Sequence, residues 1–338
     1  MKSSSLFKNK SVLITGGTGS FGNALAKRLL KEDICSKVII FSRDEWKQHE
    51  MLEIDPIFKS SKIRYFLGDV RDKNRLQRAF SQVDFIIHAA ALKQVPAAEY
   101  NPAEFIKTNV LGAMNLIDAA IDCGVEKVIA LSTDKAANPI NLYGATKLCS
   151  DKLFVAGNSY VGASEKPCFS VVRYGNVAAS RGSVIPFWRK LLLNGATSLP
   201  VTDERMTRFW ITLEEAVSFV IQCLENARGG EIFVPKISSV RISDVAKAMK
   251  KGIKLEITGI REGEKLHELM IGQEDARHTL EYDNHYIIVP EIYTHNQKLL
   301  TKFLKNRKGK KLPCDFSYAS NTNTSWLNQK EIEKFLQT

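Results

Sequence analysis

Short apolar runs alternate with helix-length segments through the first half of the chain. The runs are rich in β-branched residues and lie at 12–15, 37–41, 63–67, 83–89, 127–132 and 169–175. The segment 23–31 between the first two runs carries apolar residues at the helical period. Strands that alternate with helices form βαβ units, and continuous apolar strands are typical of a sheet covered on both faces. The pattern predicts an α/β fold with a Rossmann-type, doubly wound parallel sheet.

The regular alternation ends near residue 175. Prolines and glycines interrupt the stretch from 186 to 200, and shorter strand-like runs follow at 231–234 and 254–258. We therefore expect a second, smaller α/β lobe after the sheet domain. The predicted division places 1–175 and about 206–235 in the sheet domain, 176–205 and 236–300 in the smaller lobe, and 301–338 in a basic C-terminal segment and tail.

Composition excludes several classes of protein. The 338 residues are 44% hydrophobic and 25% charged, which is ordinary for a folded globular protein. No apolar run approaches the ~18 residues that a membrane-spanning helix needs, and the N-terminal pattern is not that of a signal peptide. The six cysteines include no CxxC pair, which favours reduced thiols over disulfides or a zinc site. These features predict a cytoplasmic protein with no metal and no membrane partner.

The net charge of +11, from 48 basic and 37 acidic residues, raises the question of nucleic-acid binding. The densest basic run, at 302–311, contains one aromatic residue, Phe303, and so lacks a platform on which bases could stack. We expect no nucleic-acid partner. A solvated tail, or a positive field that attracts an anionic small substrate, accounts for the charge.

A glycine-rich turn, TGGTGSFG at 15–22, closes the first predicted strand and opens a helix. Gly16, Gly19 and Gly22 leave room where a Cβ would block the approach of a pyrophosphate. The N-terminus of the following helix offers unpaired N–H groups to that anion. Because the turn lies in the first βαβ unit, it predicts a dinucleotide cofactor.

The end of the second strand carries residues for either nicotinamide cofactor. A carboxylate there binds the ribose 2′-hydroxyl of NAD, whereas an arginine accommodates the 2′-phosphate of NADP. Ser42, Arg43 and Asp44 leave both readings open. Arg43 comes first after the strand, Ser42 can donate to a phosphate, and Lys47 lies one helical turn beyond, so NADP is favoured.

The third and fourth strands end in residues suited to the same cofactor. Asp69 and Val70 are placed to hold the adenine edge. His88 is followed by alanines that begin with Ala89, which let a cofactor lie across the sheet edge. His88 itself is expected to pack in the core rather than to act as a catalyst.

The fifth strand leads into candidate acid–base chemistry. Tyr143 and Lys147 lie four positions apart on a predicted helix and so share one face. An isolated tyrosine, with a pKa of about 10, is a poor base at neutral pH, but an ammonium within ~4–6 Å favours its phenolate. Thr133, at the end of the strand, can hydrogen-bond the same substrate oxygen. The arrangement predicts proton transfer at a hydroxyl group.

Together, TGGTGSFG, HAAA, STDK and YGATK resemble the extended short-chain dehydrogenase/reductases. A narrower set of motifs resembles the inverting UDP-N-acetylglucosamine 4,6-dehydratases, which include enzymes that open pseudaminic acid synthesis for flagellin glycosylation. These motifs are SRDE, GDVRD, HAAALKQVP, LSTDKAANPINLYGATK, RYGNV, SRGSVIP, MTRFW and REGEKLHE. The resemblance runs from about residue 9 to the C-terminus.

The resemblance implies an NADP that is reduced and reoxidised within one turnover. Tyr143, with Lys147 and Thr133, would take the proton from the sugar's 4-hydroxyl. Lys135 would remove the carbon-5 proton and Asp134 would protonate the departing 6-hydroxyl. Retaining relatives carry glutamate at the position of Lys135, so the lysine matches the inverting branch. A basic Lys135 needs a depressed pKa, which we expect from burial and from Lys147.

The resemblance also implies a set of ligand contacts and a homo-oligomer, from dimer to hexamer. Expected cofactor contacts are Gly16, Thr18, Gly19, Ser20, Phe21, Gly22, Ser42, Arg43, Asp44, Glu45, Lys47, Asp69, Val70, Ala89, Lys93, Asn109, Tyr143, Lys147, Val177 and Arg181. Expected contacts to UDP-N-acetylglucosamine in the smaller, substrate-binding lobe and beside it are Lys93, Asn176, Val184, Thr202, Arg261 and Glu264. Arg261 suits a diphosphate because its planar fork binds two oxygens, and Glu264 suits a ribose hydroxyl.

Two alternatives remain open. A UDP-sugar 4-epimerase would share the glycines, Tyr143 and Lys147 but would have no use for Asp134 and Lys135. A catalytically silent NADP-sensing protein would commonly lose the tyrosine–lysine pair, which this chain keeps.

Overall fold

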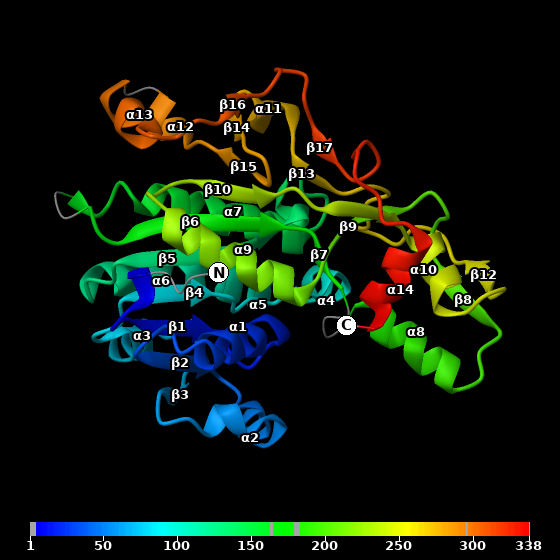
Figure 1. The fold of residues 1–338 in the computed structure, drawn as a ribbon, viewed down its shortest axis with the longest axis horizontal. Coiled ribbons are helices and arrows are strands. Elements are labelled where there is room, and N and C mark those ends of the chain that lie inside the picture. Colours follow the sequence, from blue (N-terminus) through cyan, green and yellow to red (C-terminus); the bar gives the residue numbers. More distant parts are fainter. Residues whose placement is uncertain (1–4, 163–164, 179–182, 295–296, 338) are drawn as a thin grey trace.

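A computed structural model describes residues 5–162, 165–178, 183–294 and 297–337. One ten-stranded sheet runs through the centre of this described part (Figure 1). Its strands are β1 (Ser11–Thr15), β2 (Lys37–Ser42), β3 (Ile63–Leu67), β4 (Phe85–His88), β5 (Lys127–Thr133), β6 (Cys168–Tyr174), β10 (Ile232–Pro235), β14 (Thr279–Glu281), β15 (His285–Ile288) and β16 (Lys310–Lys311). Their spatial order is β16-β14-β15-β10-β6-β5-β4-β1-β2-β3.

The predicted parallel sheet is confirmed. Strands β3, β2, β1, β4, β5, β6 and β10 run parallel to one another, each paired with the next in this spatial order. In this register Ile14 of β1 pairs with Ile40 of β2 on one side and with Ile87 of β4 on the other. The strand order reverses between β1 and β4, and in such sheets ligands bind at the carboxyl edge of this switch point.

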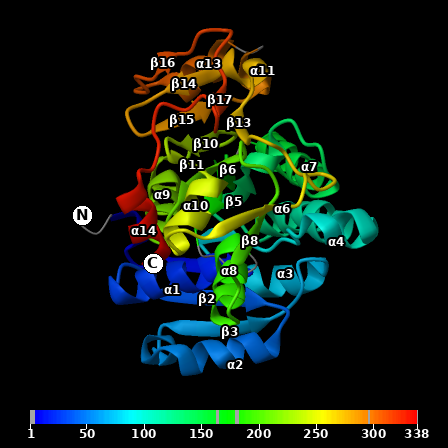
Figure 2. The ribbon, with the colours of Figure 1, turned by 90° about the vertical axis from the view of Figure 1, so that its right-hand side faces the viewer.

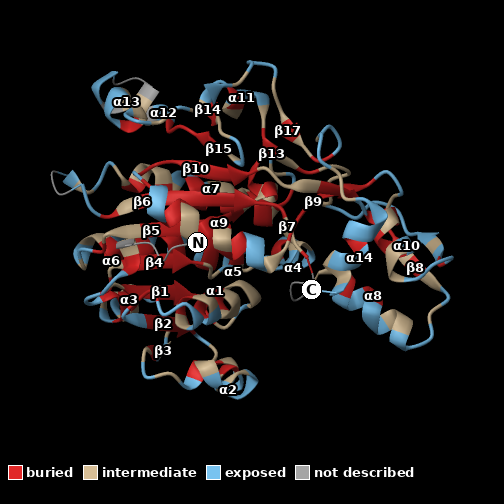
Figure 3. Cartoon of the chain, viewed as in Figure 1, coloured by how far each residue is buried: buried red, intermediate tan, exposed pale blue. Residues whose placement is uncertain are grey.

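Helices cover both faces of the sheet, as the continuous apolar strands require. Side chains alternate along β1, so that Leu13 packs with one hydrophobic cluster and Ile14 with the other. Buried residues concentrate in the sheet and on the inner sides of the helices (Figure 3). Helices α1 (Ser20–Lys31), α2 (Glu45–Ile54) and α9 (Leu213–Asn226) cover one face, and α3 (Lys73–Phe80), α6 (Gly112–Asp122) and α7 (Leu142–Gly157) the other.

Short helical segments connect these layers. The segment η3 is a π-helix that leads directly into α6, and η4 follows β5 directly. The short segments are η1 (Ser5–Phe7), η2 (Pro56–Lys59), α4 (Val95–Tyr100), α5 (Pro102–Phe105), η3 (Ile106–Leu111), η4 (Asp134–Ala136), α11 (Gln273–Ala276), α12 (Glu291–Thr294) and α13 (Gln297–Leu304). Within the described ranges, every helix is too short or too polar to cross a lipid bilayer.

A second hydrophobic unit lies beyond the carboxyl edge of the sheet (Figure 2). Trp188 and Trp210 are buried in its core, and Phe335 stacks on Trp210 with ring centroids 6.0 Å apart. Its strands and helices are β7 (Asn176–Val177), β8 (Ser198–Val201), β9 (Thr207–Ile211), β11 (Ser238–Arg241), β12 (Lys254–Ile257), α8 (Val184–Leu193), α10 (Ile242–Met249) and α14 (Gln329–Gln337). Strands β13 (Leu269–Ile271) and β17 (Tyr318–Ala319) pair beside it.

The main sheet extends further than the sequence predicted. Strands β14 and β15 fall within 236–300, which we assigned to the smaller lobe, yet they extend the main sheet through antiparallel pairing with β10 and β16. Conversely, β9 lies in the returning segment 206–235 but pairs with β7 and β11 outside the main sheet. Strands of three to five residues joined by tight turns carry too few positions to reveal their partners from sequence periodicity.

Candidate active site

The glycine turn packs too closely to accept side chains. Gly16 has a φ of +64°, and a Cβ there would lie 2.9 Å from Cα of Ala90. A Cβ on Gly22 would lie 2.5 Å from Cα of Gly17, which brings α1 against the turn. Gly19 caps α1 without a side-chain hydrogen bond, so no cap side chain covers the helix N-terminus. The turn therefore fits the pyrophosphate of a dinucleotide.

The end of β2 joins this turn through side chains. Oγ1 of Thr18 and Oγ of Ser42 lie 2.9 Å apart. Asp44 caps α2: its carboxylate accepts from the backbone N–H of Lys47 at 3.0 Å and pairs with the Lys47 ammonium at 2.7 Å. These hydrogen bonds lower the pKa of Asp44. Arg43 is half-exposed and lies 3.8 Å from Asp69, so its guanidinium is more open to a ligand than the Asp44 carboxylate is.

The other predicted cofactor residues lie along the same carboxyl edge of the sheet. Asp69 binds the guanidinium of Arg71 at 2.8 Å, and Arg71 lowers the pKa of Asp69 although burial raises it. Val70 is buried, and a Cβ on Gly112 would lie 2.9 Å from its Cγ2. The remaining positions are Ser20 and Phe21 in the first turn of α1, Glu45 in the first turn of α2, Ala89 after β4, and Val177 in β7.

Asn109 forms hydrogen bonds through its amide to the loop after β4 and to α7. Its Oδ1 accepts from the backbone N–H of Leu92 at 2.9 Å, and its Nδ2 donates to the Leu92 carbonyl and to Oγ1 of Thr146. These bonds tie the loop after β4 to α7. Both hydrogens of the amide donate within the protein, whereas Oδ1 can accept a second hydrogen bond, so the cofactor contact at Asn109 stays a prediction.

The expected core role of His88 is confirmed. Its ring is buried, and Nδ1 lies 2.8 Å from Oγ1 of Thr15. Burial, with the charge of Lys147, lowers the pKa of His88 to about 3. The imidazole is therefore neutral over the physiological range and serves packing.

The reaction-centre residues come together from three consecutive segments. Thr133 ends β5, Asp134 and Lys135 form the turn η4, and Tyr143 and Lys147 lie in the first two turns of α7. Asn141 caps α7 by accepting from the backbone N–H of Gly144 at 2.8 Å. A Cβ on Gly144 would collide with the Lys135 carbonyl, so this glycine allows α7 to approach η4.

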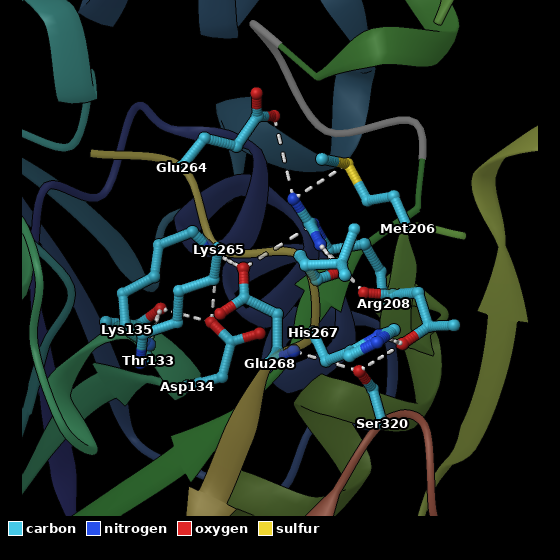
Figure 4. Close-up of polar contacts among 12 residues, drawn as sticks. Thr133, Asp134, Lys135, Met206, Arg208, Glu264, Lys265, His267, Glu268 and Ser320 are labelled. Carbon is cyan, nitrogen blue, oxygen red and sulfur yellow. Dashed lines mark hydrogen bonds and ion pairs between the residues drawn. The ribbon is translucent and has the colours of Figure 1, made fainter. Parts of the chain in front are cut away.

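Lys135 lies between two buried carboxyl groups (Figure 4). Its Nζ is 3.0 Å from Oδ1 of Asp134 and 3.0 Å from Oε1 of Glu268. Burial lowers the pKa of Lys135, but Asp134 and Glu268 raise it by more, so it stands above its ordinary value. The prediction of a depressed pKa for Lys135 is therefore wrong, because the two carboxyl groups outweigh burial.

The two carboxyl groups differ in their proton affinity. Burial and the charge of Glu268 raise the pKa of Asp134. Burial also acts to raise the pKa of Glu268, but Lys135 and the guanidinium of Arg208 lower it below its usual range. Such opposed environments favour a protonated Asp134 beside an ionised Glu268.

The positive charge of Lys135 acts on Tyr143. Burial raises the pKa of Tyr143 to about 12, against the opposing effects of Lys135 and of a hydrogen bond with Thr133. Lys147 is itself buried, which lowers its pKa, while Asp151 raises it. Asp151 in turn accepts from Oγ of Ser132 at 2.7 Å. The predicted assistance of Tyr143 by Lys147 stays a prediction, and Lys135 is a further cation that acts on the same phenol.

Arg208 and Glu268 were not singled out from the sequence. Nε of Arg208 lies 3.5 Å from Oε1 of Glu268, and its NH2 lies 3.6 Å from Oε1 of Glu264. Glu264 pairs with Arg261 at 3.0 Å. A row of alternating charges thus links Lys135 to Arg261 (Figure 4 shows it as far as Glu264). Both missed residues lie within motifs that carry the family resemblance, MTRFW and REGEKLHE.

The predicted substrate residues differ in their exposure and in whether their polar atoms already have partners. Oδ1 of Asn176 is buried and finds no hydrogen-bond partner in the described part of the chain. Lys93 is exposed near Lys135. Partial desolvation of its ammonium by the surrounding protein, together with the charge of Lys135, lowers the pKa of Lys93. Thr202 hydrogen-bonds the sulfur of Met206 at 3.3 Å. Val184 begins α8, and Arg181 lies outside the described residues.

Comparisons of sequence agree with this geometry. The family described as polysaccharide biosynthesis protein matches residues 12–290. The inverting UDP-N-acetylglucosamine 4,6-dehydratase of Campylobacter jejuni subsp. jejuni strain 81-176 is 54% identical over 97% of this chain and 97% of its own. A UDP-glucose 4-epimerase of Rickettsia akari is 40% identical over 98% of this chain and 97% of its own.

Solved structures share the fold. The structure of Pen from Bacillus thuringiensis superposes with a TM-score of 0.87 and 34% identity over 98% of both chains. The dTDP-glucose 4,6-dehydratase DesIV from Streptomyces venezuelae, solved with NAD and TYD bound, has a TM-score of 0.67 and 24% identity over 76% of this chain and 86% of its own. The predicted resemblance is confirmed: the chain belongs to the polysaccharide biosynthesis protein family, with the extended short-chain dehydrogenase/reductase fold and with similarity to inverting UDP-N-acetylglucosamine 4,6-dehydratases.

Proposed function

We propose that the chain is a hydro-lyase, an NADP-dependent UDP-N-acetylglucosamine 4,6-dehydratase that inverts carbon 5. The product would be UDP-2-acetamido-2,6-dideoxy-β-L-arabino-hexos-4-ulose. The proposal is carried by the position of Lys135. Its Nζ lies 3.0 Å from the carboxyl groups of Asp134 and Glu268, and its charge influences the pKa of Tyr143. The similarity to relatives named for this reaction supports it.

The first step is oxidation at carbon 4. When bound, the nicotinamide cofactor supplies a reversible two-electron oxidation of the sugar alcohol. Tyr143 takes the proton of the 4-hydroxyl, and Thr133 holds the same oxygen. The nearby Lys135 ammonium favours the phenolate, while burial keeps water away from the reacting oxygen.

The second step is elimination of water. The 4-ketone acidifies the proton on carbon 5, which Lys135 removes. Asp134 delivers a proton to the departing 6-oxygen: its raised pKa favours the acid form, and its buried Oδ2 has no partner within the described chain. With the hydride equivalent taken from carbon 4 returned to carbon 6, which the reduced cofactor would supply when bound, protonation of carbon 5 on the opposite face gives the 6-deoxy product and inverts that centre.

NADP, rather than NAD, fits the residues at the end of β2. The carboxylate of Asp44 is engaged as a helix cap and ion pair, which leaves it poorly placed for a ribose 2′-hydroxyl. Arg43 is half-exposed next to Ser42, and the pair offers a charged and a neutral donor to a 2′-phosphate.

The UDP-sugar would lie between the sheet edge and the smaller lobe. Arg261 would bind the diphosphate, Glu264 a ribose hydroxyl, and the unpartnered amide oxygen of Asn176 would accept a hydrogen bond from the substrate. Lys93, Val184 and Thr202 complete the proposed surface. A diphosphate would find at Arg261 a guanidinium that is already largely exposed.

We also propose a cytoplasmic homo-oligomer that acts in the synthesis of pseudaminic acid or a related glycan. Self-association is supported by large apolar side chains exposed on α4, η3 and α6, a pattern typical of contact surfaces. They are Tyr100, Ile106, Leu111 and Met114. The place in glycan synthesis rests on the family resemblance alone.

A UDP-sugar 4-epimerase is the second candidate, because relatives with that name are 40% identical over nearly the whole chain. Epimerisation needs the tyrosine–lysine pair but no base for carbon 5. Mass spectrometry of the product separates the two activities, because a dehydratase removes one water and an epimerase leaves the mass unchanged.

Lys135→Ala provides the matched test. The protein should convert UDP-N-acetylglucosamine to a product lighter by one water, and Lys135→Ala should lose this conversion. Lys247→Ala, which removes an exposed lysine of α10, should keep it. Turnover by Lys135→Ala at the unmutated rate, or a product of unchanged mass from the unmutated protein, would reject the proposal.

A further inference from the structure

Glu268 reaches the reaction centre from a distant segment and is firmly anchored there. It lies directly before β13, and its side chain is 2% exposed. Its backbone N–H donates to Oγ of Ser320 at 2.9 Å, and its carbonyl accepts from the Ser320 N–H at 2.8 Å. These two hydrogen bonds anchor Glu268, whose carboxylate contacts Nζ of Lys135 as that of Asp134 does (Figure 4).

The groups around Lys135 determine where its protons lie. Glu268 keeps Oε1 on the Lys135 ammonium, while its buried Oε2 has no hydrogen-bond partner among the described residues. Arg208 lies 3.5 Å from the same Oε1 and favours the ionised form of Glu268. The titratable and charged groups that act on this cluster are Asp134, Tyr143, Arg208, Lys93, Lys265 and Glu268.

A resting ammonium cannot remove a proton from carbon. For Lys135 to act as a base, one of its protons must leave first. Two oxygens lie within 3.0 Å of Nζ. Asp134 is the group favoured to carry a proton already, so Glu268 is the available acceptor.

We propose that Glu268 is a positioning residue that holds the Lys135 ammonium at rest and accepts one of its protons during turnover, which makes Lys135 the base for carbon 5. This inference rests on the proposed dehydration. It assigns to Glu268 a function beyond charge compensation, and it explains why Lys135 has a second carboxylate as well as Asp134.

The proton transfers of the elimination balance, and the proton that Tyr143 takes from the 4-hydroxyl balances the one that carbon 5 regains over the turnover. An N–H bond of Lys135 breaks and an O–H bond forms on Oε1 of Glu268, which frees the nitrogen lone pair. That lone pair takes the carbon-5 proton while Asp134 gives its proton to the departing 6-oxygen. Lys135 then passes a proton to Oδ1 of Asp134 and regains one from Glu268. The bridging position of Nζ, 3.0 Å from each oxygen, allows both transfers.

The pH dependence of kcat tests this role. With Glu268 as an internal acceptor, kcat should be nearly independent of pH between about pH 6 and 9. In Glu268→Gln, Lys135 must lose its proton to solvent, so kcat should fall at least tenfold at neutral pH and rise by up to about tenfold per pH unit. Glu268→Asp should restore part of kcat and flatten the profile. Glu281→Gln, which removes a carboxylate paired with Lys236 outside the site, should match the unmutated protein.

A purely structural role predicts another result. Glu268→Gln would then be slow by the same factor at every pH, and Glu268→Asp would give no change in the shape of the profile. Either that result or an unchanged kcat in Glu268→Gln would overturn the inference. If the unmutated protein forms no dehydrated product, the proposed function fails before the role of Glu268 is reached.

A second measurement needs no turnover. Acylation of lysines by acetic anhydride, followed by mass spectrometry across a pH series, reports the proton affinity of each amine. In the unmutated protein, Lys135 should reach half-maximal reactivity at a higher pH than Lys93. Glu268→Gln or Glu268→Asp should move the Lys135 midpoint to lower pH. The midpoint of Lys93 should stay unchanged in both variants. The reverse order in the unmutated protein would show that Glu268 does not hold the ammonium.

Discussion

The hydroxyl groups of Thr18 and Ser42 lie 2.9 Å apart and join the glycine turn after β1 to the end of β2. Because Arg43 follows Ser42 directly, this contact places a half-exposed guanidinium beside the loop that fits a pyrophosphate. The proposed preference for NADP is therefore tied to the same local structure that forms the cofactor turn.

Arg43→Ala should weaken NADP binding selectively. A charge-assisted hydrogen bond contributes ~1.5–3 kcal/mol, so we expect a loss of about tenfold to a hundredfold in NADP affinity and little change for NAD. Calorimetric titration with each cofactor measures this. Arg64→Ala removes an exposed arginine of β3 and is the control. Equal NADP affinity in Arg43→Ala and Arg64→Ala would contradict the assignment.

Gly22→Ala should damage the cofactor turn. The added Cβ would lie 2.5 Å from Cα of Gly17, so α1 and the turn must separate. Overpacking of this kind costs ~1–3 kcal/mol of folding free energy, and cofactor affinity should fall with it. Urea unfolding and cofactor titration measure both effects. Gly272→Ala is the matched control, since its Cβ would meet only Leu269 Cδ2 at 3.7 Å; a similar loss in both variants would argue against a specific close approach.

Asn176→Ala should raise KM for the UDP-sugar without lowering stability. Its buried Oδ1 has no partner in the described chain, so the substitution removes no hydrogen bond of that oxygen within it. Loss of one hydrogen bond to substrate, worth ~0.5–1.5 kcal/mol, should raise KM about twofold to tenfold. Asn158→Ala should show the opposite pattern, because Asn158 binds the backbone of Phe169 through both amide atoms. A stability loss in Asn176→Ala with unchanged KM would assign Asn176 to the fold.

Asp84 should make the fold sensitive to acid. Its carboxylate accepts from the backbone N–H of Ser11 at 2.8 Å and from Lys10 at 2.9 Å. Burial acts to raise the pKa of Asp84, but these donors lower it by more. A depressed folded-state pKa gives stability that is present above the unfolded value, about 4, and is lost as pH falls through the folded-state pKa.

Asp84→Asn should therefore be less stable than the unmutated protein at neutral pH, and the difference should shrink as the pH falls below about 4. Urea unfolding at a series of pH values measures this difference. Asp118→Asn, an exposed partner of Lys73, should change stability little at any pH. A difference for Asp84→Asn that stays constant from neutral to acidic pH would exclude linkage through this carboxylate.

Local sequence patterns predicted much of the fold because neighbouring residues determine where each of these strands and helices lies. The six strands of the first half follow from apolar runs, and the relation of Tyr143 to Lys147 follows from helical spacing. Glu268 and Arg208 meet Lys135 across long stretches of sequence. No periodicity encodes such a meeting, and the raised pKa of Lys135 depends on it. The antiparallel strand β15 escaped prediction for a related reason, since its partner β10 lies about 50 residues earlier.

The central claim is tested most directly by proton NMR of the purified protein with UDP-N-acetylglucosamine in deuterated water, without added reductant. The account predicts a new carbon-6 methyl signal, deuterium at carbon 5, and couplings of the L-arabino configuration. A methyl signal with D-xylo couplings would contradict the role of Lys135 in inversion. Signals of the galacto epimer without any methyl group would contradict dehydration itself.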